Sequence, residues 1–153
     1  MRRRALRDIV MFVLDTDHLG ILQDRVQPEC QRLLERIARH RWTEFYISII
    51  SFHEQVVGWN AYLNRARTMT GVVSAYQMFQ EILRDFAAMQ ILAFDAVAGE
   101  RFETLRHQQV RIGTMDLRIA SIAIAKGYTV LTRNLVDFQK VPGLAVEDWT
   151  TDH

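Results

Sequence analysis

Several features are scarce in this sequence, and each shortage narrows the class of protein. Cys30 is the only cysteine, so no disulfide can form within the chain. The longest apolar runs, at 9–14 and 122–125, are far too short to cross a bilayer. The segment after Met1 lacks the longer apolar stretch and the small-residue cleavage site of a signal peptide. We therefore expect a cytoplasmic protein with no membrane span.

Lysine is also rare, because Lys126 and Lys140 are the only lysines among 19 basic residues and the others are arginines. Arginine binds phosphate through a rigid fork of donors, which is compatible with a nucleic-acid partner. Genomic codon bias and a solvated surface explain the same composition, and the net charge of +1 favours neither interpretation. Composition alone therefore does not identify a partner.

The chain has the size and composition of one globular domain, with 153 residues of which 49% are hydrophobic and 24% charged. It contains no repeat, linker or low-complexity segment. We expect residues 1–10 to be a dispensable or disordered extension, because a second methionine, Met11, opens the first apolar run. Residues 11–153 should form a single domain.

Short apolar runs alternate with helical patterns along this domain. Strands are expected at 11–14, 45–50, 91–94, 128–131 and 144–146. Helices are expected at 18–24, 29–40, 51–65, 72–89, 96–108, 115–126 and 135–138. This alternation predicts an α/β fold, a three-layer α/β/α sandwich around a mainly parallel sheet of four or five strands.

Acidic residues stand where these strands end and helices begin. Asp15 ends the first strand, Glu54 lies in the first turn after the second strand, and Asp116 lies in the first turn of a mostly apolar helix. Asn134 and Asp137 follow the fourth strand. Because the carboxyl ends of strands and the amino ends of helices share one edge in such folds, we expect these residues to lie together.

Each acidic residue also has a purely structural explanation. Ser51 and Glu54 fit a capping box, and we interpret Asp17 and Asp95 as helix caps. Small residues follow Glu54 and Asp116 at one and two helical turns, which favours close packing on the sheet and a partly buried edge; they are Gly58, Ala61, Ala120 and Ala123. Carboxylates gathered at such an edge repel one another unless a cation is bound.

Oxygen ligands without a histidine or cysteine set favour Mg²⁺ or Mn²⁺ over zinc. His18 and His53 neighbour the acidic positions but form no zinc-type pair, and no glycine-rich phosphate loop is present. A metal–carboxylate site would activate water and neutralise charge on a phosphodiester, with one carboxylate accepting the proton. Arg133, which adjoins Asn134, is the first candidate to bind such a polymer.

Four ordered segments, 14–19, 47–54, 116–123 and 131–138, read LDTDHL, ISIISFHE, DLRIASIA and LTRNLVDF. Together they resemble the motifs of PIN-domain ribonucleases, and most closely those of VapC-type toxins of bacterial toxin–antitoxin pairs. The ending at 141–149 is similar too, so the resemblance spans about 11–149. It implies a PIN-like fold and a metal-dependent endoribonuclease toxin that cleaves RNA, is neutralised by a cognate antitoxin, and is frequently a homodimer.

The same resemblance implies that Asp15, Glu54 and Asp116 are metal-binding catalytic acids, with Thr16 and Ser51 as supporting hydrogen-bond donors. The family often has aspartate where Asn134 stands, and Asp137 is the alternative fourth ligand. An amide still offers an oxygen to Mg²⁺ but lowers the negative charge of the site. We therefore expect weaker metal affinity rather than loss of activity.

Two other functions fit parts of the sequence. The run Asp15-Thr16-Asp17 after a strand also begins the nucleophile motif of haloacid-dehalogenase-like phosphatases, but Leu19 stands where that motif usually has Thr or Val. The two lysines also leave few candidates for the cation that such a phosphatase requires. The non-enzymatic alternative is a PIN-like protein that binds RNA or a partner without cutting it.

Two apolar faces are candidates for a partner surface. The helix at 72–89 carries aromatic residues at helical spacing, and Trp59 and Tyr62 form another apolar face. Such faces are more often core than interface. A toxin must nevertheless offer an apolar groove to its antitoxin, and we predict that some of these residues line it.

Overall fold

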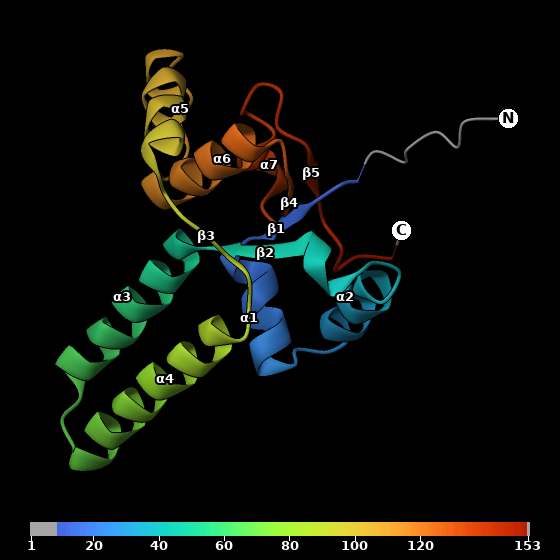
Figure 1. Cartoon of the computed structure of the whole chain (residues 1–153). Coiled ribbons are helices and arrows are strands. Elements are labelled where there is room, and N and C mark those ends of the chain that lie inside the picture. The colour runs from blue at the N-terminus through green and yellow to red at the C-terminus, as the bar shows by residue number, and fades with distance from the viewer. Residues whose placement is uncertain (1–8, 153) are drawn as a thin grey trace, which may run out of the picture.

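The computed structural model describes residues 9–152, and its centre is a five-stranded parallel sheet (Figure 1). The strands lie in the order β3-β2-β1-β4-β5. Their bounds are β1 Phe12–Leu14, β2 Phe45–Ser48, β3 Ile91–Leu92, β4 Thr129–Leu131 and β5 Val146–Glu147. Every neighbouring pair is parallel, so the predicted α/β class and sheet type are confirmed.

Helices cover both faces of this sheet and give three layers. In Figure 1, α5, α6 and α7 lie above the sheet, α1 and α2 lie below it, and α3 with α4 projects to the lower left as a pair. The helices are α1 Thr16–Asp24, α2 Glu29–Ile37, α3 Ile49–Arg65, α4 Met69–Ala87, α5 Ala96–His107, α6 Thr114–Lys126 and α7 Leu135–Phe138. Each expected helix is present, with boundaries shifted by no more than a few residues.

Alternating side chains of the central strands build separate cores on the two faces. Val13 and Val130, which are paired in the sheet, pack against α6. Their neighbours Leu14 and Leu131, also paired, point to the other face and pack with Leu33 of α2. A strand buried on both faces reads as a continuous apolar run, which is why the sequence segment is recognisable despite its short length.

The small residues of α6 and those of α3 have different surroundings. Ala120 and Ala123 are completely buried, as the sequence predicts for a helix packed on a sheet. Gly58 of α3 is exposed and Ala61 is half-buried, so the expected close packing is wrong there. The reason is that α3 leaves the sheet after its first turns and packs with α4 instead.

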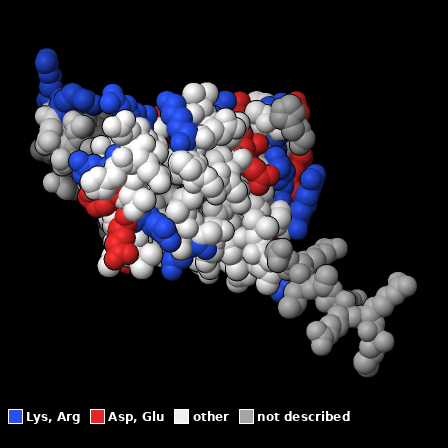
Figure 2. Space-filling view, turned by 90° about the horizontal axis from the view of Figure 1, so that it is seen from above, with Lys and Arg blue, Asp and Glu red and all other residues white. Residues whose placement is uncertain are grey.

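Basic side chains are dispersed over the surface. On the face seen from above, Lys and Arg form several separate groups divided by acidic and uncharged surface (Figure 2). Some arginines are also engaged within the fold, since Arg32 pairs with Asp152 at 2.8 Å and Arg36 lies over the Trp149 ring at 4.8 Å. On this face, richness in arginine therefore produces no single basic patch (Figure 2).

Two expectations concern the ends and the membrane. The extension predicted at 1–10 lies outside the described residues except for Ile9 and Val10, which are exposed and belong to no helix or strand. Within residues 9–152, no helix is both long and apolar enough to span a bilayer.

The contrast between α6 and α3 predicts opposite effects of adding a side chain. Ala123→Leu should lower the free energy of unfolding by about 1–3 kcal/mol, because the site has no free space. Gly58→Ala should raise it by about 0.5–1 kcal/mol, because no atom lies within 4 Å of a Cβ built there and glycine weakens a helix interior. Urea unfolding of both variants measures this, and equal effects would contradict the packing described.

Candidate active site

Asp15 is the most deeply buried carboxylate at the carboxyl edge of the sheet. Its Oδ1 accepts a hydrogen bond from the Thr16 backbone N–H at 2.8 Å, and its Oδ2 accepts one from the Thr132 hydroxyl at 2.8 Å. Asp15 is therefore the cap of α1, and the expectation that Asp17 caps this helix is wrong. Burial and the negative charge of Asp17 raise the pKa of the Asp15 carboxyl to about 7, although both hydrogen bonds oppose that rise.

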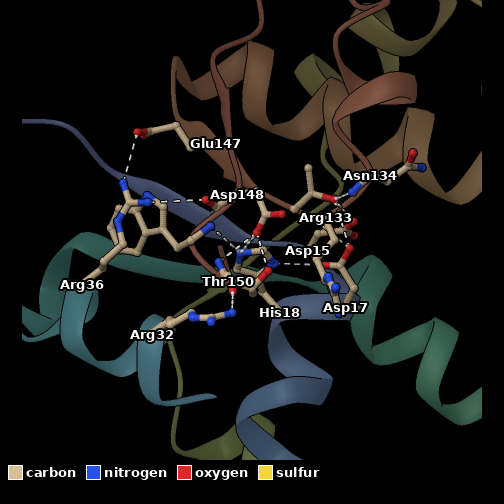
Figure 3. Close-up of polar contacts among 12 residues, drawn as sticks. Asp15, Asp17, His18, Arg32, Arg36, Arg133, Asn134, Glu147, Asp148 and Thr150 are labelled. Atoms are coloured by element: carbon tan, nitrogen blue, oxygen red, sulfur yellow. Dashed lines mark hydrogen bonds and ion pairs between the residues drawn. The ribbon is translucent and has the colours of Figure 1, made fainter. Parts of the chain in front are cut away.

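Asp17 joins the acidic edge to the last segment of the chain (Figure 3). Its Oδ2 accepts from the Arg133 backbone N–H at 2.9 Å, and its Oδ1 lies 2.8 Å from His18 Nδ1. His18 is fully buried, and its Nε2 accepts from the Trp149 backbone N–H at 3.2 Å, so Nδ1 carries the proton that Asp17 accepts. Burial favours the neutral acid, but the hydrogen bonds from His18 and Arg133 outweigh it and lower the pKa of Asp17.

Sequence reasoning missed this role of Asp17 and His18. The hydroxyl of Thr132 also lies 3.2 Å from Asp17 Oδ2, so it stands between two carboxylates while carrying only one proton. The adjacency of Asp17 and His18 was a visible signal, but their partners Thr132 and Trp149 are more than 110 residues away in sequence. Spacing along the chain cannot reveal such partners.

The side chains of Glu54 and Ser51 both contact the Thr16 hydroxyl at the start of α1. The cap of α3 is Ser48, whose hydroxyl accepts from the Ser51 backbone N–H at 3.3 Å, so the predicted capping box of Ser51 and Glu54 is wrong. The strand ends at Ser48 and the helix starts earlier than expected. One turn apart on this helix, Ser51 and Glu54 both point at Thr16, whose Oγ1 lies 2.9 Å from Ser51 Oγ and donates to Glu54 Oε1 at 3.0 Å.

The electrostatic environment of Glu54 resembles that of Asp15. Partial burial and the negative charge of Asp116 raise the pKa of the Glu54 carboxyl, and the hydrogen bond from Thr16 opposes this only in part. Thr16 therefore adjoins both acids, through its backbone N–H to Asp15 and its hydroxyl to Glu54. This is the supporting position expected for Thr16 and Ser51.

Asp116, Asn134 and Asp137 form the remaining part of the edge. Asn134 Nδ2 donates to Asp137 Oδ2 at 3.0 Å and to Asp116 Oδ2 at 3.4 Å, while its Oδ1 accepts from the Asp137 backbone N–H at 3.4 Å. Burial and the charge of Asp137 raise the pKa of Asp116. Asn134 and Lys140, which lies 3.2 Å from Asp137 Oδ1, lower the pKa of Asp137. The charge of Asp137 is thus compensated, whereas that of Asp116 is not.

Three of the predicted acids therefore share one property. Asp15, Glu54 and Asp116 all have raised pKa values, and each feels the charge of at least one other acid at the edge. A cation bound among them would relieve this repulsion, and carboxylate oxygens are the ligands that Mg²⁺ and Mn²⁺ prefer. The chemistry of the donors thus fits such an ion.

The positions of the donors limit how the ion could be held. Among residues 9–152, no group of three His, Cys, Asp or Glu side chains is arranged to hold a metal ion. Mg²⁺ usually keeps several waters and contacts only one or two carboxylates, so this arrangement is compatible with a water-rich site. Arg133 is exposed beside it, with its backbone N–H bound to Asp17, and the role of its side chain stays a prediction.

Comparison with known proteins gives consistent relatives, although no protein-family model matches the chain. Ribonuclease VapC1 of Rickettsia felis is 26% identical over 117 residues, which cover 72% of this chain and 83% of that protein. The tRNA(fMet)-specific endonuclease VapC of Salmonella typhimurium is 34% identical over 65 residues, 40% of this chain and 49% of that protein. The crystal structure of VapBC2 from Rickettsia felis bound to a promoter DNA fragment matches with a TM-score of 0.66 and 26% identity, over 92% of this chain and 99% of that chain.

The parallel sheet with its acidic carboxyl edge defines an α/β domain of the PIN type. In sequence and in fold the chain is similar to VapC proteins, as the resemblance of its four motifs predicts. The roles of the individual acids are inferred from the geometry above.

The raised pKa of Asp15 predicts how stability depends on pH. An unfolded aspartate titrates near about 3.9 and folded Asp15 near about 7, so the folded protein binds the extra proton between these values. The stabilising contribution is present below about pH 4 and is lost as pH rises through about 7. Asp15→Asn stays neutral and should gain stability over the wild type across this window, on the order of 2–4 kcal/mol at pH 8.

Urea unfolding from pH 4 to 8 in EDTA measures this difference. Asp95→Asn is the matched control, because Asp95 also caps a helix, accepting from the Ala98 backbone N–H at 3.0 Å. If the difference in free energy of unfolding between Asp15→Asn and the wild type does not grow with pH, the charge of Asp15 does not destabilise the folded protein.

Proposed function

We propose that this protein is a metal-dependent endoribonuclease that hydrolyses RNA phosphodiester bonds and acts as the toxin of a toxin–antitoxin pair. The observation that carries the proposal is the gathering of Asp15, Glu54 and Asp116, each with a raised pKa, at one edge of the sheet. The names of the relatives, a ribonuclease and a tRNA-specific endonuclease, support RNA as the class of substrate.

Each residue of the edge has a definite part in this proposal. Asp15, Glu54 and Asp116 would hold Mg²⁺ or Mn²⁺, in part through the ion's waters, with Asn134 and Asp137 beside them. The bound ion would supply an activated water and neutralise charge on the phosphate. Thr132 fixes the Asp15 carboxylate, Thr16 fixes Glu54, and the Asn134 amide bridges Asp116 and Asp137.

Glu54 is better placed than Asp15 to accept a proton. Within residues 9–152, only its Oε1 is hydrogen-bonded, whereas both carboxylate oxygens of Asp15 are engaged. Its raised pKa brings it closer to neutral pH, where a general base works best. We therefore propose Glu54 as the acceptor of the proton from the attacking water, with Asp116, whose Oδ1 also accepts no hydrogen bond among residues 9–152, as the alternative.

The phosphatase alternative requires Asp15 to attack a phosphate as a nucleophile. Asp15 is only 5% exposed, and both of its oxygens accept hydrogen bonds. Of the two lysines, Lys140 pairs with Asp137 and Lys126 ends α6, at the opposite end from Asp116. These contacts favour the nuclease. Binding without cleavage is separated from it by the assay below.

We also propose a cognate antitoxin, a homodimer and a cytoplasmic location. The α4 surface is available for a partner, because a groove of about 520 Å³ is lined mainly by its apolar side chains, Met69, Val72, Val73, Tyr76, Phe79 and Leu83. Tyr62 of α3 is also exposed. An amphipathic antitoxin helix fits an apolar groove of this kind.

Protein freed of any antitoxin should cleave RNA with Mg²⁺ or Mn²⁺ and lose this activity in EDTA. Asp15→Asn and Asp116→Asn should each lower the initial rate by at least about a hundredfold, because they remove charge from the proposed site. Gel analysis of end-labelled RNA gives the rate. Asp95→Asn is the control, since Asp95 lines a pocket with Lys126 at the far end of α6.

Two outcomes would decide against the proposal. If both variants cleave RNA as fast as the wild type, Asp15 and Asp116 do not take part in the reaction. Retention of RNA and metal by the wild type with no cleavage would identify a binding protein instead of an enzyme.

Asn134→Asp should tighten metal binding. The substitution replaces an amide that donates to Asp116 and Asp137 by a third carboxylate, which raises the negative charge facing an ion. Calorimetric titration with Mn²⁺ compares the variant with the wild type, and Asn134→Ala controls for loss of the amide. No tightening in Asn134→Asp would show that residue 134 does not adjoin the ion.

A further inference from the structure

A second polar cleft adjoins the acidic edge between the end of α5 and the start of α6. Its volume is about 790 Å³, and three arginines, Arg106, Arg111 and Arg118, line it together with apolar side chains such as Phe102. The cleft meets the site at two points. Asp137 belongs to the acidic edge and also lines the cleft. Gly113 lies in the wall of the cleft, and a Cβ built on it would lie 3.9 Å from Asp116 Oδ2.

Two of the three arginines of this cleft have no acidic partner in the part of the chain that the structure describes. Among residues 9–152, neither Arg111 nor Arg118 lies within ion-pair distance of a carboxylate. Arg118 is half-buried, and its nearest polar contact is Met115 Sδ at 3.6 Å. The Arg106 guanidinium lies 5.7 Å from the centre of the Phe102 ring, and its Nη1 lies 3.6 Å from Glu103 Oε1. A half-buried guanidinium without a counter-ion is stabilised by an anionic ligand.

The cleft on the other side of Thr16 has the opposite character. It has a volume of about 400 Å³ between α1, α3 and α4, and the acidic residues Asp24, Glu81 and Asp85 accompany only one arginine, Arg84. A polyanion that passes the acidic edge is therefore repelled on this side and attracted on the side of α5 and α6.

We propose that the cleft between α5 and α6 binds the RNA backbone next to the scissile phosphate, with Arg111 and Arg118 on phosphates and the Arg106–Phe102 pair against a base. This inference rests on the proposed function and adds the path of the substrate. Single-stranded RNA is the form that fits, because a basic groove follows its backbone and an aromatic ring stacks on its bases. The strand then reaches the acids across Gly113.

The test is binding of a fluorescein-labelled single-stranded RNA 12-mer to the full chain in EDTA, followed by anisotropy over a range of salt concentrations. Arg111→Ala and Arg118→Gln should each weaken binding by about tenfold, the effect of losing one charge-assisted hydrogen bond. Each should also reduce the slope of log K against log salt by about 0.7. Arg84→Ala removes the same charge from the opposite cleft and should leave both quantities close to those of the wild type.

Circular dichroism melts verify that the variants fold, and Arg111 is exposed, so its loss leaves the core intact. Equal loss in Arg84→Ala and Arg111→Ala would mean that only net charge matters and would overturn the assignment. Unchanged RNA binding with a shift to monomer in sedimentation would make the cleft an interface between copies.

The cleavage assay separates this inference from the proposed function. If the arginine variants bind and cleave RNA normally, the proposed nuclease activity is supported and the proposed role of the cleft is contradicted. If RNA binding depends on Arg111 and Arg118 but the wild type does not cleave RNA, the proposed role of the cleft is supported and the proposed nuclease activity is contradicted.

Discussion

The crowding of carboxylates at the carboxyl edge of the parallel sheet is the constraint on which the rest of this structure depends. A parallel sheet brings the ends of β1, β2 and β4 to one edge, and there the chain places Asp15, Glu54 and Asp116. Burial and mutual repulsion raise all three pKa values, so these residues are poorly stabilised as anions by the protein alone. Charge crowded in this way works against folding, and the proposed cation would relieve it.

The fold holds this edge in place with neutral donors, not with basic side chains. Thr132 and the Thr16 backbone hold Asp15, the Thr16 hydroxyl holds Glu54, and Asn134 holds Asp116. Neutral donors fix a carboxylate without cancelling its charge, whereas an arginine or lysine would occupy the place of the metal. Lys140 contacts only Asp137, at the margin of the site.

Local patterns in the sequence predicted the fold and the convergence of the acids, because alternation of strands and helices puts the carboxyl ends of parallel strands at one edge whatever their order. They failed where two explanations competed for one residue. Asp15 is both cap and site residue, while Asp17, expected to be a cap, instead binds Arg133 and His18. Trp149, the distant partner of His18, follows β5, so only the folded structure reveals this contact. The prediction that α3 packs closely on the sheet at Gly58 was wrong for a related reason. Small residues in a helix do not show which neighbour the helix packs against.

The structure also separates the surfaces that a nuclease toxin needs. The α4 groove is apolar, the cleft beside Thr16 is acidic, and the cleft beside Gly113 is lined by three arginines. A polyanion and an amphipathic helix are therefore directed to different places by charge and hydrophobicity. Because Thr16 lines the acidic cleft and also touches Asp15 and Glu54, a ligand bound there adjoins the site without covering the arginine cleft. A ligand on one side and the proposed RNA on the other would then meet only at the acids between the two clefts.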